Sequence, residues 1–462
     1  MTIKHTFVVT TALLCAVAAL VMGVTSADAK QAAVPWTQIT HAHSGAKANL
    51  GLARGKDGTL HVLWGGPARP PYTALFDTPI SPAGKVGQPQ TVVSGWNSIQ
   101  SPAAVAGADG SIHVLISGQK VLSTSDPYAG LSEAVGPGSW SLGQHAFGSY
   151  QLTVSSAADV SAAMLGSGEL VTAWRSAVLL LFQRGMDPAT QPQVVTPPND
   201  LVELPAIAAD RSGGDVVVAF HSVKSGGDFF RRVLPSLDAP QAWPQAKILS
   251  PALVARSRGG VYTAYTPDGS KVWLLPFGGQ PKPVPVPKGV RVLTAGLAPG
   301  PDGRLWVFYG NEQQTFVTRT SMAVSGFEPV QTLSTPAGTL QYFRLEGEGS
   351  AGPLDLFADV TIDGGAKDGS YQSHVLPKLS LAVAKKQLKN KQGQVTGVRV
   401  TVRALDAGDP IAGVTVSGLP GGAKTTDSSG SVVVTAAVGK KGTFALTAGK
   451  RGYVSVKGKA SL

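Results

Sequence analysis

The sequence predicts an all-β fold, and three observations support that prediction. Glycine and proline are abundant, at 56 and 33 of 462 residues, whereas only 15% of the residues are charged. This composition suits many short strands joined by turns. No long stretch has the 3.6-residue hydrophobic spacing of an amphipathic helix. Finally, one phrase recurs along the chain: small apolar residues, then a turn (often Asp-Gly), then an alternating strand that ends near an aromatic residue.

The phrase can be followed seven times at a steady period. GLARGKDGTLHVLWGG (51–66) and AGLAPGPDGRLWVFYG (295–310) are clear copies. The copies span 50–64, 103–116, 162–174, 206–220, 252–265, 295–309 and 340–357, so their last large residues are 44 to 58 positions apart. Periods of roughly 40 to 50 residues, with four short strands each, are typical of β-propeller blades. Two separate β-sandwiches would not keep so regular a period.

Each part of the phrase has a physical reason in a propeller. The first strand lines the central channel, where space is scarce, and it uses small residues such as AAVA (103–106). Asp-Gly turns such as Asp57-Gly58 supply the positive φ that tight hairpins need. The second strand ends on a ring that can fill the wedge between blades: Trp64, Trp174, Phe220, Tyr265, Tyr309 or Phe357.

Third and fourth strands follow in each copy. KVLST (120–124) is predicted as the third strand of the second blade, and AKIL (246–249) as the fourth strand of the fourth blade. The seventh copy lacks a fourth strand, whereas VPWTQIT (34–40) resembles EPVQTLS (328–334). We therefore predict a seven-bladed β-propeller over residues 30–377, in which the N-terminal strand completes the last blade. Closure of the ring removes free sheet edges.

Residues 1–29 read as an export signal peptide. Lys4 precedes the apolar run 7–24, and Ala27-Asp28-Ala29 has the form of a cleavage site, so we expect the mature chain to begin at Lys30. An uncleaved anchor is the alternative, but the run is short for a membrane span. The single cysteine, Cys15, lies inside the signal, so the mature chain has no disulfide. We expect a secreted monomer, free or associated with the cell envelope.

The composition changes after Pro377, and residues 378–462 are predicted to form a second domain, a β-sandwich. The segment holds 14 Lys and Arg but only three acids, Asp406, Asp409 and Asp427. Residues 30–377 hold 24 basic and 24 acidic residues, so the whole net charge of +11 lies on the tail.

A domain of this charge is expected to meet anionic material. Outside a bacterial cell, that means wall-linked phosphate polymers, acidic polysaccharides or anionic lipid head groups, and nucleic acid is not expected. The alternative is that the charge only keeps the domain soluble. Binding through exposed lysines would weaken with added salt, which separates the two. The predicted anionic-polymer residues are Lys385, Lys386, Lys389, Lys391, Lys440, Lys441, Lys450 and Arg451.

A second candidate site is the channel mouth, where the loops between blades and the loops after the second strands meet. Aromatic and polar groups around a concave mouth suit a sugar or a peptide. Alternatively, Trp96 and Tyr150 only pack their loops. His41 and His43, with His145 and His221, could ligate a metal, but exposed loop histidines explain them better, so no metal or cofactor is expected. The candidate ligand-binding residues are His41, His43, Arg69, Trp96, Tyr150, Arg175, His221 and Asn311.

Two family resemblances bear on these expectations. The blade pattern, over about residues 34–376, resembles the bacterial sialidase-like propellers built from BNR-type repeats. The resemblance implies an arginine on the first inner strand, but that position falls near Ala48, and neighbouring Lys47 cannot supply a two-pronged grip. The family's Ser-x-Asp-x-Gly-x-x-Trp box is also absent, since Ser123-Thr124-Ser125-Asp126 lacks its glycine and tryptophan. The sialidase residues therefore do not carry over.

The tail resembles bacterial Ig-like and carboxypeptidase-regulatory-like accessory domains. The matching residues are Pro410 with AGVTV (412–416), TTDSSG (425–430) and Gly452-Tyr453. This resemblance implies an Ig-like β-sandwich with an adhesive or spacing role and no catalysis.

The sequence as a whole therefore predicts an exported bacterial protein with a non-enzymatic binding or adhesion role, whose propeller takes a glycan or a protein ligand. A carbohydrate-active enzyme, either a sialidase-like glycoside hydrolase or a polysaccharide lyase, is the alternative, and a scaffold for protein partners is a third reading. An enzyme would need acids at the channel mouth. Few acids lie in the inter-blade loops, Asp200 and Glu203 being the clearest, which favours binding.

Overall fold

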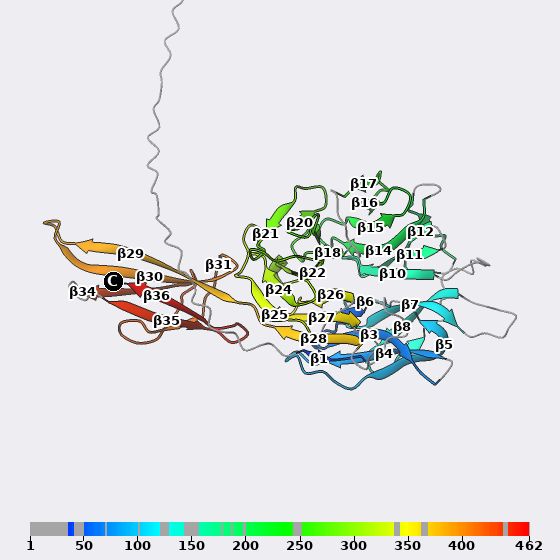
Figure 1. The fold of residues 1–462 in the computed structure, drawn as a ribbon, viewed down its shortest axis with the longest axis horizontal. Coiled ribbons are helices and arrows are strands. Elements are labelled where there is room, and N and C mark those ends of the chain that lie inside the picture. Colours follow the sequence, from blue (N-terminus) through cyan, green and yellow to red (C-terminus); the bar gives the residue numbers. More distant parts are fainter. Residues whose placement is uncertain are drawn as a thin grey trace, which may run out of the picture.

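The computed structural model describes residues 36–40, 50–69, 72–99, 102–120, 129–142, 157–176, 179–185, 187, 189–196, 200–243, 252–336, 342–361, 368–437 and 442–461. Over these residues the protein is all-β, and the one short helical element is the 3-10 turn η1 (Pro301–Gly303). Figure 1 shows a ring of sheets with an elongated tail that projects along the long axis of the molecule. The described part of the chain holds no helix long and apolar enough to cross a membrane.

The first two blades share one eight-stranded sheet. They join because the outer strand of the first blade pairs with the second strand of the next, with Ile99 opposite Gly118. The third strand of the second blade was predicted at 120–124, but Lys120 belongs to β7 and residues 121–124 lie outside the described residues. The strand that pairs with β7 as the third strand is β8. The strands of these two blades are β2 (Gly51–Arg54), β3 (Leu60–Pro67), β4 (Thr73–Ile80), β5 (Gln90–Ile99), β6 (Ala103–Ala106), β7 (Ile112–Lys120), β8 (Ala129–Gly136) and β9 (Ser141–Leu142).

The next four blades are separate four-stranded sheets in chain order. The outer strand of the fourth blade is β17, whereas the predicted strand at 246–249 lies outside the described residues. The strands are β10 (Ala157–Met164), β11 (Leu170–Ser176), β12 (Leu179–Arg184), β13 (Gln193–Val194), β14 (Val202–Ala209), β15 (Val216–Ser222), β16 (Gly227–Leu234), β17 (Gln241–Ala242), β18 (Val254–Ala255), β19 (Val261–Tyr265), β20 (Val272–Pro276), β21 (Lys282–Val284), β22 (Thr294–Pro299), β23 (Leu305–Gly310), β24 (Gln314–Arg319) and β25 (Gln331–Ser334).

The last blade takes its outer strand from the N-terminal end of the chain. Its strands are β26 (Tyr342–Glu348), β27 (Leu354–Thr361), β28 (Gly369–Val375) and β1 (Thr37–Gln38). Thr37 lies opposite Gln372, and the Ile39 N–H donates to the Ser370 carbonyl at 2.9 Å. The predicted closing strand is therefore confirmed.

An ion cluster reinforces this closure. Arg54 of the first blade contacts two carboxylates of the last blade, Glu348 and Asp355, and its Nη2 lies 2.7 Å from Asp355 Oδ2. All three side chains are at most 9% exposed. The first strands also follow one another around the axis, from β2 through β6, β10, β14, β18 and β22 to β26, which touches β2 again. The described strands thus form a closed ring of seven four-stranded blades.

Packing at the centre and between blades matches the repeat. A Cβ at Gly51 would lie 3.2 Å from the Ala104 Cβ of the neighbouring blade, so even an alanine there would require its neighbours to shift slightly. Gly58 has a φ of +85°, as the predicted turn requires. The rings that end the second strands are all at most 7% exposed: Trp64, Trp174, Phe220, Tyr265, Tyr309 and Phe357.

The strand directions give the ring two different faces. The first strands begin at one face, which we call the mouth face, and turn into the second strands at the other, which we call the turn face. Third strands end at the turn face as well. β28 is a third strand and ends at Val375, so the chain leaves the ring at the turn face and enters the tail.

The tail is a sandwich of two four-stranded sheets. One contains β29 (Leu379–Lys389), β30 (Val395–Asp406), β31 (Asp409–Pro410) and β34 (Ser431–Ala437), and the other contains β33 (Lys424–Thr425), β32 (Thr415–Ser417), β35 (Thr443–Gly449) and β36 (Val456–Ser461). Alternate residues of the strands face inward, so that Val400, Val402, Val434 and Leu446 are buried in one core. The other residues of each strand face the solvent.

Candidate functional site

A cavity of about 300 Å³ occupies the centre of the ring. Much of its lining comes from the beginnings of the first strands, which places it toward the mouth face. Small and apolar side chains predominate, and every blade contributes: Leu52, Ala104, Ser161, Ile207, Leu253, Ala295 and Leu345 are one lining residue from each.

One charged pair at the cavity comes from the third blade. Asp159 lies where the register of β10 against β11 shifts, and it has a φ of +53°. Such bulges re-aim a side chain, and here Asp159 lines the cavity. Its Oδ2 lies 3.2 Å from Nε of Arg175, and both side chains are about one quarter exposed, at 27% and 28%.

A second charged pair comes from the last blade. Arg344 Nε lies 3.0 Å from Glu346 Oε1, and both residues line the cavity. Glu346 Oε2 also accepts the N–H of Leu50, which ties the last blade to the first at 3.1 Å. Behind this pair, burial raises the pKa of Asp359 to about 6, although the Ser370 hydroxyl and Arg344 both oppose the rise.

The two carboxylates among the described lining residues are therefore each held by an arginine. Such pairs offer donors and acceptors to the hydroxyl or amide groups of a ligand. Neither carboxylate is placed as an isolated acid. No three His, Cys, Asp or Glu side chains of the described residues gather as a metal site.

The described residues of the predicted channel-mouth set do not gather into one site. Arg175 reaches the cavity through Asp159, but His221 pairs with Asp228 of its own blade at 2.9 Å. Asn311 lies in the turn between β23 and β24, and its amide donates to the carbonyl of Arg291, in the segment before β22, at 2.9 Å. Arg69 is an exposed residue after β3. His41, His43 and Tyr150 lie outside the described residues.

The sequence suggested that Trp96 lies on a loop, but the structure places it in a strand. It lies inside β5 and is 3% exposed, packed in the core shared by the first two blades. Gly95, with a φ of +78°, and shifts in the pairing of β4 with β5 explain why the stretch looks like a turn. A substitution of Trp96 would therefore change the core, which is a correction to the expectation of a free stacking surface.

The predicted basic residues of the tail are mostly exposed. Lys385, Lys386, Lys389, Lys391 and Arg451 are exposed, Lys450 is half-buried and donates to the Ala412 carbonyl at 2.7 Å, and Lys440 and Lys441 lie outside the described residues. Sequence reasoning missed five further exposed cations among the described residues: Arg399, Arg403, Lys424, Lys457 and Lys459. The alternation in VRVTVRA (398–404) was the available signal, because it places Arg399 and Arg403 on the outward face of one strand.

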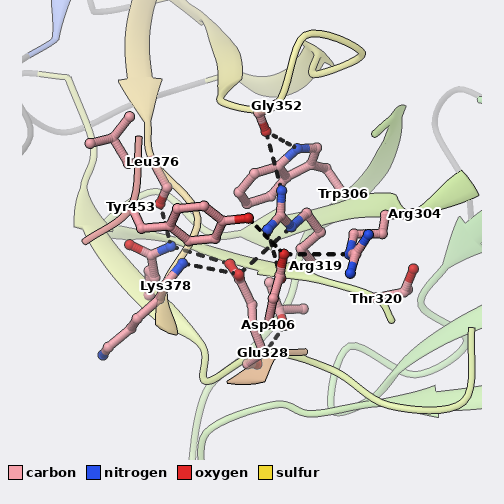
Figure 2. A network of polar contacts seen from close by, with 12 residues as sticks. Arg304, Trp306, Arg319, Thr320, Glu328, Gly352, Leu376, Lys378, Asp406 and Tyr453 are labelled. Carbon is pink, nitrogen blue, oxygen red and sulfur yellow. Dashed lines mark hydrogen bonds and ion pairs between the residues drawn. The ribbon is translucent and has the colours of Figure 1, made fainter. Parts of the chain in front are cut away.

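Two of the three tail acids face the propeller instead of the solvent, and Figure 2 shows one of them, Asp406, beside Arg319. Asp406 Oδ1 lies 2.7 Å from Nη2 of Arg319, and Asp409 Oδ2 lies 2.8 Å from Nη2 of Arg304. Arg319 is 1% exposed and its guanidinium lies over the rings of Trp306 and Tyr453, at 4.9 and 5.9 Å from their centroids. We call this cluster the joint.

The joint also contains a third carboxyl, Glu328. Its Oε2 accepts the N–H of Lys378 at 3.1 Å, and Arg319 Nε is 3.9 Å away. Glu328 is 1% exposed, and its burial raises its pKa to about 8, an effect that Arg319 partly offsets. The Tyr453 hydroxyl donates to Asp406 at 3.0 Å, so the tail contributes both charge and hydrogen bonds to the contact.

Comparison with known proteins gives structural matches of low similarity and none in sequence. No protein-family model matches the chain, and no curated protein matches its sequence. An ulvan lyase of polysaccharide lyase family PL25, solved with -[GlcA(1-4)Rha3S]- bound, has 9% identity and a TM-score of 0.48 over 74% of this chain and 96% of its own. Polysaccharide lyase Uly1 has 11% identity and a TM-score of 0.44 over 75% and 94%. An α-L-arabinanase of Penicillium chrysogenum has 10% identity and a TM-score of 0.40 over 60% and 93%.

Proposed function

We propose that this protein is an exported, non-enzymatic binding protein whose tail attaches to an anionic polymer and whose propeller holds a glycan or protein ligand at the channel mouth. The observation that carries the proposal is the use of the tail's acids. Asp406 and Asp409 are engaged in the joint, so Asp427 is the one acid left to face 14 Lys and Arg residues of the tail. The charged side chains on the outer surface of the described part of the tail are thus almost all cationic.

Such a surface supports attachment through many weak contacts. A single exposed ion pair contributes less than about 1 kcal/mol, so a small anion would gain little from one lysine. A polymer that carries many anionic groups engages many cations at once, and the later contacts form at high effective concentration. Added salt weakens each contact, because screening shortens the reach of exposed charges.

The mature chain, residues 30–462, tests this attachment in a salt series. We expect it to sediment with purified bacterial cell envelopes and to be retained on immobilised anionic polymers, with retention lost as salt rises toward 1 M, where the screening length is about 3 Å. Neutral dextran serves as the control surface. Binding that persists at high salt, or equal binding to dextran, would overturn the electrostatic attachment.

The propeller's part of the proposal rests on the lining of the cavity. The two carboxylates in the cavity lining, Asp159 and Glu346, are each paired with an arginine, which suits the orientation of a polar ligand, and neither carboxylate stands free as an acid or a base. A glycan array with the mature protein, followed by hydrolase and lyase assays on each hit, tests it. Turnover of any bound glycan would replace the binding role with the carbohydrate-active enzyme.

A further inference from the structure

The outward face of the sheet formed by β29, β30 and β34 carries three parallel rows of side chains. One outer row is Lys386, Arg399 and Thr435, the middle row is Ala384, Thr401 and Val433, and the other outer row is Ala382, Arg403 and Ser431. The three residues of each row lie directly opposite one another on neighbouring strands, so their side chains share one face. We call this surface the arginine face.

The cations of the arginine face are free for an external ligand. Lys386, Arg399 and Arg403 are exposed, and none of the three forms an ion pair or a side-chain hydrogen bond with any described residue. This contrasts with the joint, where Arg304 and Arg319 are both paired with tail acids. No acidic side chain lies in any of the three rows.

The spacing of the face is set by the strand. Arg399 and Arg403 are four residues apart on β30, which corresponds to about 13 Å at roughly 3.3 Å per residue. The middle row between them has only small side chains, with Val433 49% exposed. The face therefore offers two guanidinium groups separated by a flat strip of methyl and hydroxyl groups.

We propose that the arginine face binds a polysaccharide that carries carboxylate groups, such as a chain of uronic acids. Guanidinium groups match the planar, two-oxygen geometry of a carboxylate, which a lysine does not. The strip between them accommodates the flat face of an uncharged part of the sugar chain against Thr401 and Val433. This inference rests on the attachment function proposed above and assigns both the surface and the chemical class of the polymer.

Other polyanions fit the face less well. The three rows contain no aromatic side chain on which a base could stack. They also lack the large apolar side chains by which a surface inserts into a lipid head-group region. Binding to nucleic acid or to anionic lipid is therefore measured beside binding to the carboxylated polysaccharide in the test.

The test compares two charge reversals in the mature full-length chain. Arg399→Glu with Arg403→Glu alters the arginine face, and Lys457→Glu with Lys459→Glu makes the same change in net charge on the outward face of the other sheet, where both lysines are exposed. Affinity for immobilised polygalacturonate is measured at one fixed, low salt concentration. We expect a loss of about tenfold or more, or about 1.4 kcal/mol, for the arginine variant and less than about twofold for the lysine variant.

A third variant separates geometry from charge. Arg399→Lys with Arg403→Lys keeps the charge but removes the two-pronged donors, and we expect it to lose part of the affinity for polygalacturonate while its retention on dextran sulfate changes little. Equal losses in both charge-reversed proteins would overturn the face assignment and leave the general attachment intact. Stronger binding to polyphosphate, DNA or anionic vesicles than to polygalacturonate would overturn the carboxylate assignment. If the wild type binds none of these polymers at low salt, the attachment function itself fails.

Discussion

At the scale of single residues, protonation of Glu328 decides the charge balance of the joint. With a pKa of about 8, this carboxyl is neutral at pH 7. Arg304 and Arg319 then face Asp406 and Asp409 in equal number, so the buried charges cancel. Ionisation of Glu328 would add an unbalanced negative charge in a place that water barely reaches, which is costly.

The charge state of Glu328 leads to a pH prediction. Its folded pKa lies above the usual value of 4.5, so the folded protein binds more protons than the unfolded chain between these values. The stabilisation is complete at low pH and is lost as pH rises through about 8. We expect Glu328→Gln to match the wild type near pH 5 and to exceed it at pH 9 by about 1 kcal/mol or more in unfolding free energy.

Denaturant unfolding at pH 5, 7 and 9 checks this prediction. Asp359 also has a raised pKa, of about 6, so its contribution to the pH dependence of stability falls mostly below pH 7. The wild type and the Glu328→Gln protein share this contribution. A Glu328→Gln protein that loses as much stability as the wild type between pH 7 and pH 9 would contradict the assigned role.

Residue-scale features differ in how far the sequence could predict them. The buried rings at the ends of the second strands follow from the repeat, because a fixed period implies one equivalent wedge per blade. The Arg319–Asp406 pair joins residues 87 positions apart and belongs to no repeat, so no pattern indicates it. The loop prediction for Trp96 was wrong for a local reason. Gly95 and Asn97 flank it and resemble a turn in the sequence, whereas the structure has Gly95 within the strand β5.

At the scale of secondary-structure elements, β1 is the shortest part of the last blade and yet completes it. It covers the free edge of β28, and Ile39 beside it is 4% exposed. Trp36 adds a hydrogen bond from its Nε1 to the Ser334 carbonyl at 2.6 Å, which reaches the neighbouring blade. The resemblance between 34–40 and 328–334 was sufficient to predict this strand, because each is the outermost strand of its blade and pairs with the third strand in the same way.

Removal of the closing strand should therefore open the ring. We expect a chain that begins at residue 41 to lose about 3 kcal/mol or more of unfolding free energy, from the buried side chains and the ladder hydrogen bonds, and to associate through the bare edge. Thermal unfolding and size-exclusion chromatography, with the chain that begins at Lys30 as reference, measure both effects. Equal midpoints and a monomeric shortened chain would argue against closure by β1.

At the scale of the whole molecule, the joint makes ring and tail depend on each other. A chain that ends at Pro377 leaves Arg304 and Arg319 without their tail carboxylates. The loss of one partner costs about 3–5 kcal/mol where the other stays buried, and this is an upper bound here because removal of the tail also lets water reach the two arginines. We expect the shortened propeller to unfold at a clearly lower denaturant concentration than the propeller in the full chain, as followed by tryptophan fluorescence.

The full-length Asp406→Asn protein is the matched comparison, because it keeps the tail and removes one carboxylate. It should show part of the same loss, whereas Asp427→Asn, at an exposed turn, should not. A shortened propeller as stable as the full chain would mean that the joint only positions the tail. The sequence predicted the propeller from its repeat and the tail from its change in composition. It did not predict this contact, because the interface depends on side chains from separate domains.

The placement of the tail has a consequence for how the molecule is presented. Arg304 follows the first turn of its blade and Arg319 ends a third strand, so the tail leaves from the turn face, while the cavity lies toward the mouth face. In the attachment role proposed above, the tail would serve as a stalk. A molecule held by it, in the role proposed above, points the open end of the ring away from its support and displays its binding pocket to whatever passes outside.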